Sequence, residues 1–281
     1  MSLSETTRKV LGLVEERSGI PVHVEPDPNL PGTILAKVVM ARENLLLHRV
    51  FYRPNSTTPP DYLICQQAGF ILRFFAVPAD RRFDFAASDA GTKAVEELVK
   101  AHPVAKMLPP QALPQLTTML RDGLLSHLRS IPLGMRVDRW LAAEFPDLIP
   151  LQKQSILRQL EDSAVTLAPQ HRQTAAFAAY WARRLNQPQA VLPFKSAGNL
   201  HSGEILLDIW ENTPDDAAND RLIVDQWAEN SGSPAGNNGC HTQRQDKTWL
   251  RSLSPSRRPL LTRAWCRRRH GIPALPPFEK R

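Results

Sequence analysis

Hydrophobic and polar positions follow two different periods in the first part of the chain, and these periods predict one helix and three strands. Apolar residues at helical spacing behind a capping serine, Ser4, predict a helix over residues 4–17. The next stretch, "IPVHVEP", alternates apolar and polar side chains, which is typical of a short strand, and the prolines of "PDPNLP" end it. Two further strand-like runs, "TILAKVVMA" and "LLLHRVFY", are joined by Arg42, Glu43 and Asn44 and predict a hairpin.

The stretch "DYLICQQAGFILRFF", residues 61–75, has a different pattern because it is apolar on nearly every side. Thr58 is a good N-cap, Pro59 and Pro60 suit the first helical turn, and Asp61 favours the positive end of the helix dipole. A helix of this kind is buried on most of its faces. Its strongly polar residues are Gln66, Gln67 and Arg73. Buried amides must find hydrogen-bond partners, so the adjacent glutamines require an explanation.

The rest of the chain to about residue 230 has a looser helical pattern. Helices are expected over 88–101, 111–129, 134–145, 150–161, 173–185 and 215–229, the last with Thr213 as its cap and Pro214 at its first position. "AVLPFKSAGNLHSGEILLDIW" fits either a strand pair or a short helix, and periodicity is lost from Ser231 onward. The expected fold class is α+β. A small N-terminal sheet with a buried central helix (1–110) precedes a mainly helical region (111–230) and a disordered tail (231–281).

Composition places the chain among ordinary globular proteins and bears on its location. Hydrophobic residues make up 42% and charged residues 22% of the 281 residues. No run approaches the roughly 18 apolar residues that would span a bilayer, so no membrane partner is expected. The N-terminus has no apolar signal core, and three cysteines give no disulfide framework. We therefore expect a cytoplasmic protein.

The excess of positive over negative charge lies in the last fifty residues. The whole chain carries +7, but residues 232–281 contain eleven basic and two acidic residues, which gives +9, and leaves −2 for residues 1–231. Nucleic-acid binding is therefore expected only through the tail, with the following arginines as candidate contacts: Arg257, Arg258, Arg267, Arg268 and Arg269. Two other interpretations stay open, namely a solvated tail without a role and a sequence translated from a shifted reading frame.

The order helix, strand, hairpin and central helix, with "YRPNSTTPPDY" before that helix, resembles the ImmA/IrrE family of zinc metallopeptidases. Where that family has HExGHxLR, this chain has "QQAGFILR". Gly69, Leu72 and Arg73 match the pattern, whereas Gln66, Gln67 and Phe70 replace the two histidines and the glutamate. The resemblance covers about residues 4–75 and extends more loosely to "KMLPP" at 106–110.

The resemblance implies a zincin-like fold in which the metal chemistry has been lost. The two histidines of HExxH lie one helical turn apart and bind one zinc ion, while the glutamate activates water. A glutamine amide is a poor zinc ligand, and a phenylalanine has no lone pair to offer. The third family ligand is an acid on a later helix, for which Glu96 and Glu97 are weak candidates. We therefore expect no metal, no cofactor and no catalytic residues.

Other candidate groups have simpler explanations. His23 and His48 lie on neighbouring predicted strands, and strand histidines without a metal are far more common than a two-histidine site. Cys65 fits a buried, inert thiol better than a nucleophile. The stretch from Arg136 to Trp140, with Asp138 and Arg139, suits a solvated helix face better than a docking surface. The spacing of Cys240–His241 and "CRRRH" at 266–270 does not match a zinc finger.

Three functional hypotheses follow. The first is a non-catalytic pseudo-metallopeptidase that acts as a protein-interaction or regulatory module in a bacterial or phage-related setting, as the resemblance implies. The second is an active peptidase with relocated ligands drawn from His23, His48 or later acids. The third is a nucleic-acid binder that works through the tail.

Overall fold

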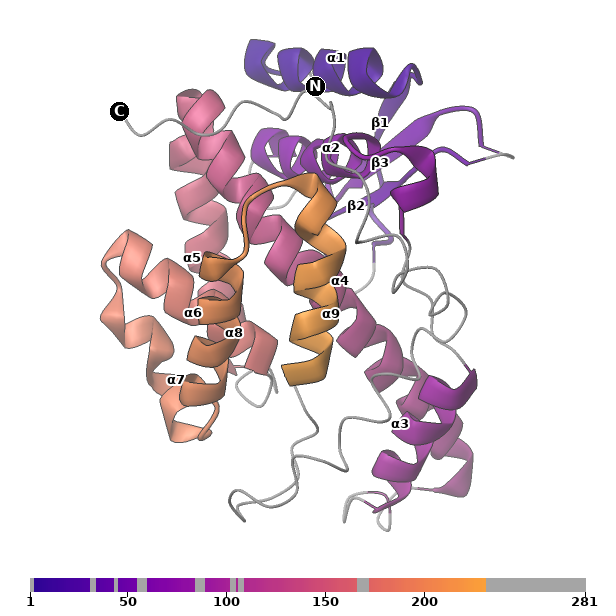
Figure 1. Ribbon diagram of the computed structural model, residues 1–281, viewed down its shortest axis with the longest axis vertical. Helices are drawn as coiled ribbons and strands as arrows, with labels where there is room; N and C mark the ends of the chain where they lie inside the picture. Colours follow the sequence, from indigo (N-terminus) through magenta and orange to yellow (C-terminus); the bar gives the residue numbers. More distant parts are fainter. Residues whose placement is uncertain are drawn as a thin grey trace, which may run out of the picture. The chain divides into compact units, whose positions relative to one another are not determined.

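The computed structural model describes residues 3–30, 34–42, 45–54, 60–83, 89–101, 105, 109–165 and 172–230. The expected α+β class is confirmed in its coarse form, with a small three-stranded sheet near the N-terminus and helices after it (Figure 1). The predictions for residues 231–281, Thr58 and Pro59, and most of "KMLPP", lie outside the described residues. No helix in the described ranges is both long and apolar enough to cross a bilayer.

The chain divides into two compact units that interleave along the sequence. One unit combines Met1–Phe83 with Ile131–Asp208, and the other combines Asp84–Ser130 with Ile209–Arg281. The expected boundaries at residues 110 and 230 stay predictions. One long helix, α4 (Leu113–Glu144), has its second half in the same unit as the N-terminal sheet.

The first helix, α1 (Glu5–Ser18), confirms the prediction for residues 4–17. The Ser4 hydroxyl accepts a hydrogen bond from the Thr7 backbone N–H at 3.1 Å, which satisfies one of the free donors at the helix start. Gly19 ends the helix with a φ of 69°, in the left-handed region that favours glycine. Val10 and Val14 are fully buried one turn apart, as the apolar stripe indicated.

Three strands form the sheet: β1 (Val22–Pro26), β2 (Ala36–Val39) and β3 (His48–Tyr52). The strand order is β1-β3-β2, so β3 lies in the centre. β2 pairs antiparallel with β3, which confirms the predicted hairpin, and β1 pairs parallel with β3. Alternation along β3 places Val50 in the core and leaves Arg49 partly exposed on the other face.

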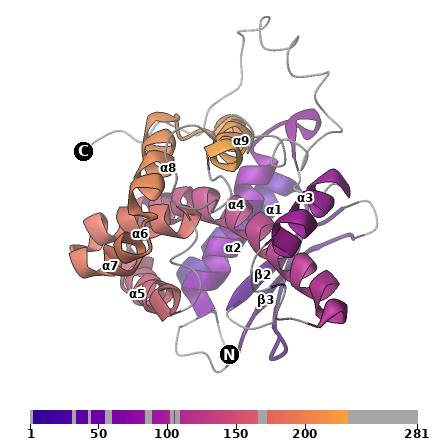
Figure 2. The ribbon, with the colours of Figure 1, turned by 90° about the horizontal axis from the view of Figure 1, so that it is seen from below.

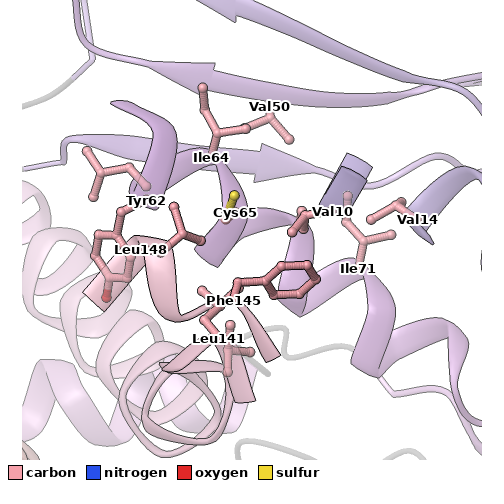
Figure 3. Packing of buried hydrophobic residues seen from close by; sticks show 13 residues of the cluster. Val10, Val14, Val50, Tyr62, Ile64, Cys65, Ile71, Leu141, Phe145 and Leu148 are labelled. Carbon is pink, nitrogen blue, oxygen red and sulfur yellow. The ribbon is translucent and has the colours of Figure 1, made fainter. Parts of the chain in front are cut away.

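The central helix α2 (Pro60–Phe75) packs against both α1 and the sheet (Figure 1 and Figure 2). Its buried residues are Tyr62, Leu63, Ile64, Cys65, Ala68, Gly69 and Ile71. Figure 3 shows Ile64 beside Val50 of the sheet, while Tyr62 and Leu148 lie on the side of α2 away from the sheet. The helix is therefore covered on two sides, as its nearly continuous apolar pattern predicted.

The remaining helices are α3 (Asp89–Ala101), α4 (Leu113–Glu144), α5 (Ile149–Val165), α6 (Arg172–Leu185), α7 (Leu192–Ser196), α8 (Leu200–Asn212) and α9 (Asp220–Asn230). The prediction of separate helices over 111–129 and 134–145 was wrong, because α4 continues through Pro132. A proline removes one N–H donor and favours a helix end, but the helix on either side of Pro132 is held by packing, since Leu128 and Leu133 are both buried.

The structure shows which element one ambiguous segment forms, and it corrects one expected helix start. "AVLPFKSAGNLHSGEILLDIW" is helical, forming α7 and α8. The expected cap at Thr213 was wrong, because the Thr213 hydroxyl donates back to the carbonyl of Ile209 and so extends the end of α8. Asp216 is the cap instead: its carboxylate accepts from the Ala218 N–H at 3.1 Å before a short 3-10 turn leads into α9.

Helices α6, α7 and the first part of α8 lie side by side (Figure 2). α6 is rich in alanine, and α8 contributes Gly203 where the two helices meet. A Cβ atom on Gly203 would lie 2.7 Å from the backbone carbon of Ala175 and from the backbone nitrogen of Ala176. Only a glycine permits this approach, so small side chains set the distance between α6 and α8.

Candidate functional site

The side chain of Gln66 is held in a polar cluster between helices. Its Nε2 donates to Oδ1 of Asp138 at 3.0 Å and to the Tyr62 hydroxyl at 3.2 Å. The Tyr62 hydroxyl donates to the same Asp138 oxygen at 2.7 Å. The half-buried amide of Gln66 therefore has its partners, and they come from α2 itself and from the second half of α4.

A close helix crossing brings these groups together. On α2, Tyr62 and Gln66 lie one turn apart and so share a face. Gly69, three positions after Gln66, lies where α2 crosses α4. The two helices are so close there that a Cβ on Gly69 would lie 2.3 Å from Cγ1 of Val137. Phe70 extends the contact, since its Cζ lies 3.5 Å from the position that a Cβ on Gly134 would take.

Helix α5 completes the cluster. Nε2 of Gln152 donates to the backbone carbonyl of Asp138 at 2.8 Å. The cluster therefore connects three helices of one unit: α2 through Tyr62 and Gln66, α4 through Asp138, and α5 through Gln152. We call these four residues the Asp138 cluster.

Asp138 is almost completely withdrawn from water, with 1% of its surface exposed. Burial raises the pKa of its carboxyl to about 7, against hydrogen bonds from Tyr62, Gln66 and Gln152 that lower it. Burial, followed by the nearby Asp138, raises the pKa of Tyr62 well above its usual value, so its hydroxyl stays a donor. The cluster is thus built from neutral donors around one acidic group.

The three positions that would carry metal chemistry in the resembled family differ in their surroundings. Gln66 is bonded within the Asp138 cluster, Phe70 packs on α4, and Gln67 is half-buried. Phe70 is also only half-buried, at the edge of the hydrophobic core and not at its centre. Among the residues that the structure describes, no group of three or more His, Cys, Asp or Glu side chains could hold a metal ion.

The stretch from Arg136 to Trp140 is not a solvated helix face, contrary to the sequence-based interpretation. Arg136 and Asp138 are buried, and Arg139 and Trp140 are half-buried. This half of α4 is covered because its charged residues lie among apolar ones that pack into the core, including Val137 and Leu141. A charged residue on a helix indicates solvent only when no neighbouring element covers it.

His23 and His48 do not approach each other. In the parallel register Val22 pairs with His48, and His23 pairs with Arg49. Paired residues share a face of the sheet and successive residues alternate, so the two histidines point to opposite faces. His23 is exposed, whereas His48 is fully buried. Nδ1 of His48 accepts from the Ala41 N–H at 3.0 Å, its ring meets Phe75 edge to face, and burial lowers its pKa.

Cys65 is fully buried, as expected for an inert thiol. Burial raises its pKa to about 12, while a hydrogen bond from the thiol to the Thr7 hydroxyl at 3.7 Å lowers it. Thr7 also donates to Asp61 at 2.6 Å, and the Ser4 N–H donates to the same oxygen at 2.9 Å. Burial alone would raise the pKa of Asp61, but these hydrogen bonds outweigh it and hold the pKa below its usual value. Asp61 thus ties the starts of α1 and α2 together.

The remaining acidic candidates are engaged elsewhere. Glu96 and Glu97 lie on α3, in the other unit, and form ion pairs with Lys100 at 2.8 Å and 3.3 Å. The acid that faces Gln66 is Asp138, which sequence reasoning missed. The signal for it was Gln66 itself, because an amide on a mostly buried helix implies a polar partner, but nothing in the sequence pattern says on which helix that partner lies. The candidate nucleic-acid contacts of the tail lie outside the described residues, as do Cys240 and Cys266; these contacts are Arg257, Arg258, Arg267, Arg268 and Arg269.

No protein-family model, no curated protein and no solved structure matches this chain.

Proposed function

We propose that this protein is a non-catalytic relative of the ImmA/IrrE-like metallopeptidases that acts as a protein-interaction or regulatory module. The observation that carries the proposal is the bond from Gln66 to Asp138 at 3.0 Å. At the position of the first histidine in the resembled motif, this chain has an amide that is bonded between helices. A group used in this way holds the fold together and is not free to bind a metal or a substrate.

Two further observations support the proposal. The order of elements, from α1 through β1, β2 and β3 to α2, is the order on which the resemblance rests. An acid of a later helix, Asp138, faces the motif helix, as the third ligand does in the resembled family, although it accepts hydrogen bonds here. The alternative of an active peptidase with relocated ligands is disfavoured by the placement of His23 and His48 on opposite faces of the sheet.

Metal content and peptidase activity test the proposal. The purified protein should hold no stoichiometric zinc by elemental analysis, and it should cleave no member of a mixed peptide library followed by mass spectrometry. Metal-dependent cleavage that a chelator removes would overturn the non-catalytic assignment. One zinc ion per chain in the unaltered protein would contradict the loss of the ligand set.

Restoring the motif tests the ancestry separately. In the variant Q66H/Q67E/F70H, two imidazoles are one helical turn apart on α2 and Asp138 faces them, which is the donor set that zinc prefers. We expect this variant to bind about one zinc ion per chain, and Asp138→Asn in the same background to weaken that binding. Thermal unfolding with and without zinc shows whether the variant is folded. A folded variant that binds no zinc would refute the metallopeptidase-like scaffold.

A further inference from the structure

The Asp138 cluster has a property that the proposed function does not use. Asp138 has a carboxyl group in a buried position, and among the described residues no cation forms an ion pair with it. An ionised carboxylate that is withdrawn from water without a counter-charge is strongly destabilising, whereas a protonated one is not. The cluster should therefore respond to pH.

The groups that face Asp138 supply hydrogen bonds but no compensating charge. Helix α2 presents Tyr62 and Gln66, and helix α5 presents Gln152. Of these three side chains only that of Tyr62 can ionise. Burial, followed by the nearby Asp138, raises the pKa of Tyr62 well above its usual value, so its hydroxyl stays neutral. On α4 itself, Arg136 and Arg139 are two and one positions away, and residues at these spacings do not face each other on a helix.

We propose that the Asp138 cluster is a proton-dependent lock that holds α2, α4 and α5 together most tightly when Asp138 is protonated. Uptake of one proton removes the buried negative charge and leaves a neutral, hydrogen-bonded contact between the three helices. Loss of that proton at higher pH weakens the contact. The inference does not depend on the metallopeptidase resemblance, because it uses only the burial and the partners of one carboxyl group.

The sign of the effect follows from the direction of the shift. Because the pKa of Asp138 is about 7 in the folded protein, above the ordinary value of 3.8, the folded state binds more protons than the unfolded state between these values. Its stabilising contribution is complete below the ordinary pKa and is lost as the pH rises through about 7. Between pH 5 and pH 8 the folded-to-unfolded ratio should fall about a hundredfold through this group alone.

Urea unfolding of the full chain between pH 5 and pH 8.5 tests the lock. The comparison of wild type with Asp138→Asn isolates the group, because other carboxylates and His48, whose burial acts in the opposite direction, are common to both proteins. We expect the wild type to lose stability relative to D138N as the pH rises through about 7. Equal pH dependence in the two proteins would overturn the proposal.

A second variant keeps the test decisive if D138N does not fold. Tyr62→Phe removes a hydrogen bond that lowers the pKa of Asp138, so the pH at which stability is lost should move upward. A purely structural role of Tyr62 would lower stability equally at all pH values. Asp61→Asn is the matched control on the same helix: because the pKa of Asp61 is lowered, its removal should reduce stability about equally from pH 5 to pH 8.5 and should change the pH dependence only at more acid pH. An unchanged transition pH in Y62F would refute the lock.

Discussion

Replacing Gly69 by alanine tests the close crossing of α2 and α4 on which the candidate site depends. A Cβ at position 69 would lie 2.3 Å from Cγ1 and 3.1 Å from Cγ2 of Val137, whereas carbon atoms in contact are normally about 3.5–4 Å apart. Val137 is buried and branched at Cβ, so it has essentially one side-chain rotamer in a helix and cannot turn away. The two helices must therefore move apart.

The magnitude is a difference of two opposing effects. Forcing an extra methyl group into a packed core costs about 1–3 kcal/mol, and the better helix propensity of alanine offsets up to about 1 kcal/mol. We expect Gly69→Ala to reduce the free energy of unfolding by about 1–2 kcal/mol, which is measured by urea unfolding followed by circular dichroism. Gly12→Ala is the matched control, because nothing lies within 4 Å of its added methyl group in α1. That variant should be stabilised by about 0.5–1 kcal/mol.

A double-mutant cycle assigns the cost to Val137. In a Val137→Ala background the two γ-methyl groups are absent, so Gly69→Ala should be less destabilising there by about 1 kcal/mol or more. If Gly69→Ala stabilises the protein as much as Gly12→Ala does, α2 and α4 do not cross at this point. Such a result would also remove the basis for the Gln66–Asp138 contact.

Three further predictions test other parts of the chain. Gly203→Ala should destabilise the protein by about 2–3 kcal/mol in the same urea assay, because the added methyl group meets α6 backbone that cannot rotate away; a neutral result would contradict the α6–α8 contact. Cys65 should resist alkylation in the native protein and react only after denaturation, as mapped by mass spectrometry, because its thiol is buried and its pKa is raised to about 12. Removing residues 232–281 changes the net charge from +7 to −2, so any affinity for DNA should vanish with the tail and, in the full chain, fall steeply as salt rises. A truncated chain that keeps its DNA affinity in a salt titration would place a nucleic-acid site in the body.

The sequence predicted the elements with strong local signals. Ser4 as a cap, the alternating strands and the apolar α2 all depend on residues close in the chain, and each was found where expected. α4 shows the limit of such reasoning. Pro132 is a local signal for a helix end, but tertiary packing on both sides of it overrides that preference.

Of the candidate site, the sequence predicted the α2 side but not the α4 side. Gln66 and Phe70 were identified on one face of α2, because positions four apart share a helix face. Asp138 was assigned to solvent, since a charged residue between two arginines has the local pattern of an exposed helix. Its burial depends on the crossing at Gly69, a contact between residues far apart in sequence that no local pattern contains.

The interleaving of the two units has a consequence for synthesis on the ribosome. The nascent chain completes β1, β2, β3 and α2 long before residues 131–144 exist to cover the face of α2 that carries Tyr62 and Gly69. Until residues 131–144 are made, this surface of α2 is not covered by α4. Folding of the unit is therefore delayed until this contact, which is distant in sequence, can form. A fragment that ends near residue 110 would keep that surface of α2 exposed, so it should aggregate or be bound by chaperones and cleaved by proteases as an incompletely folded chain is.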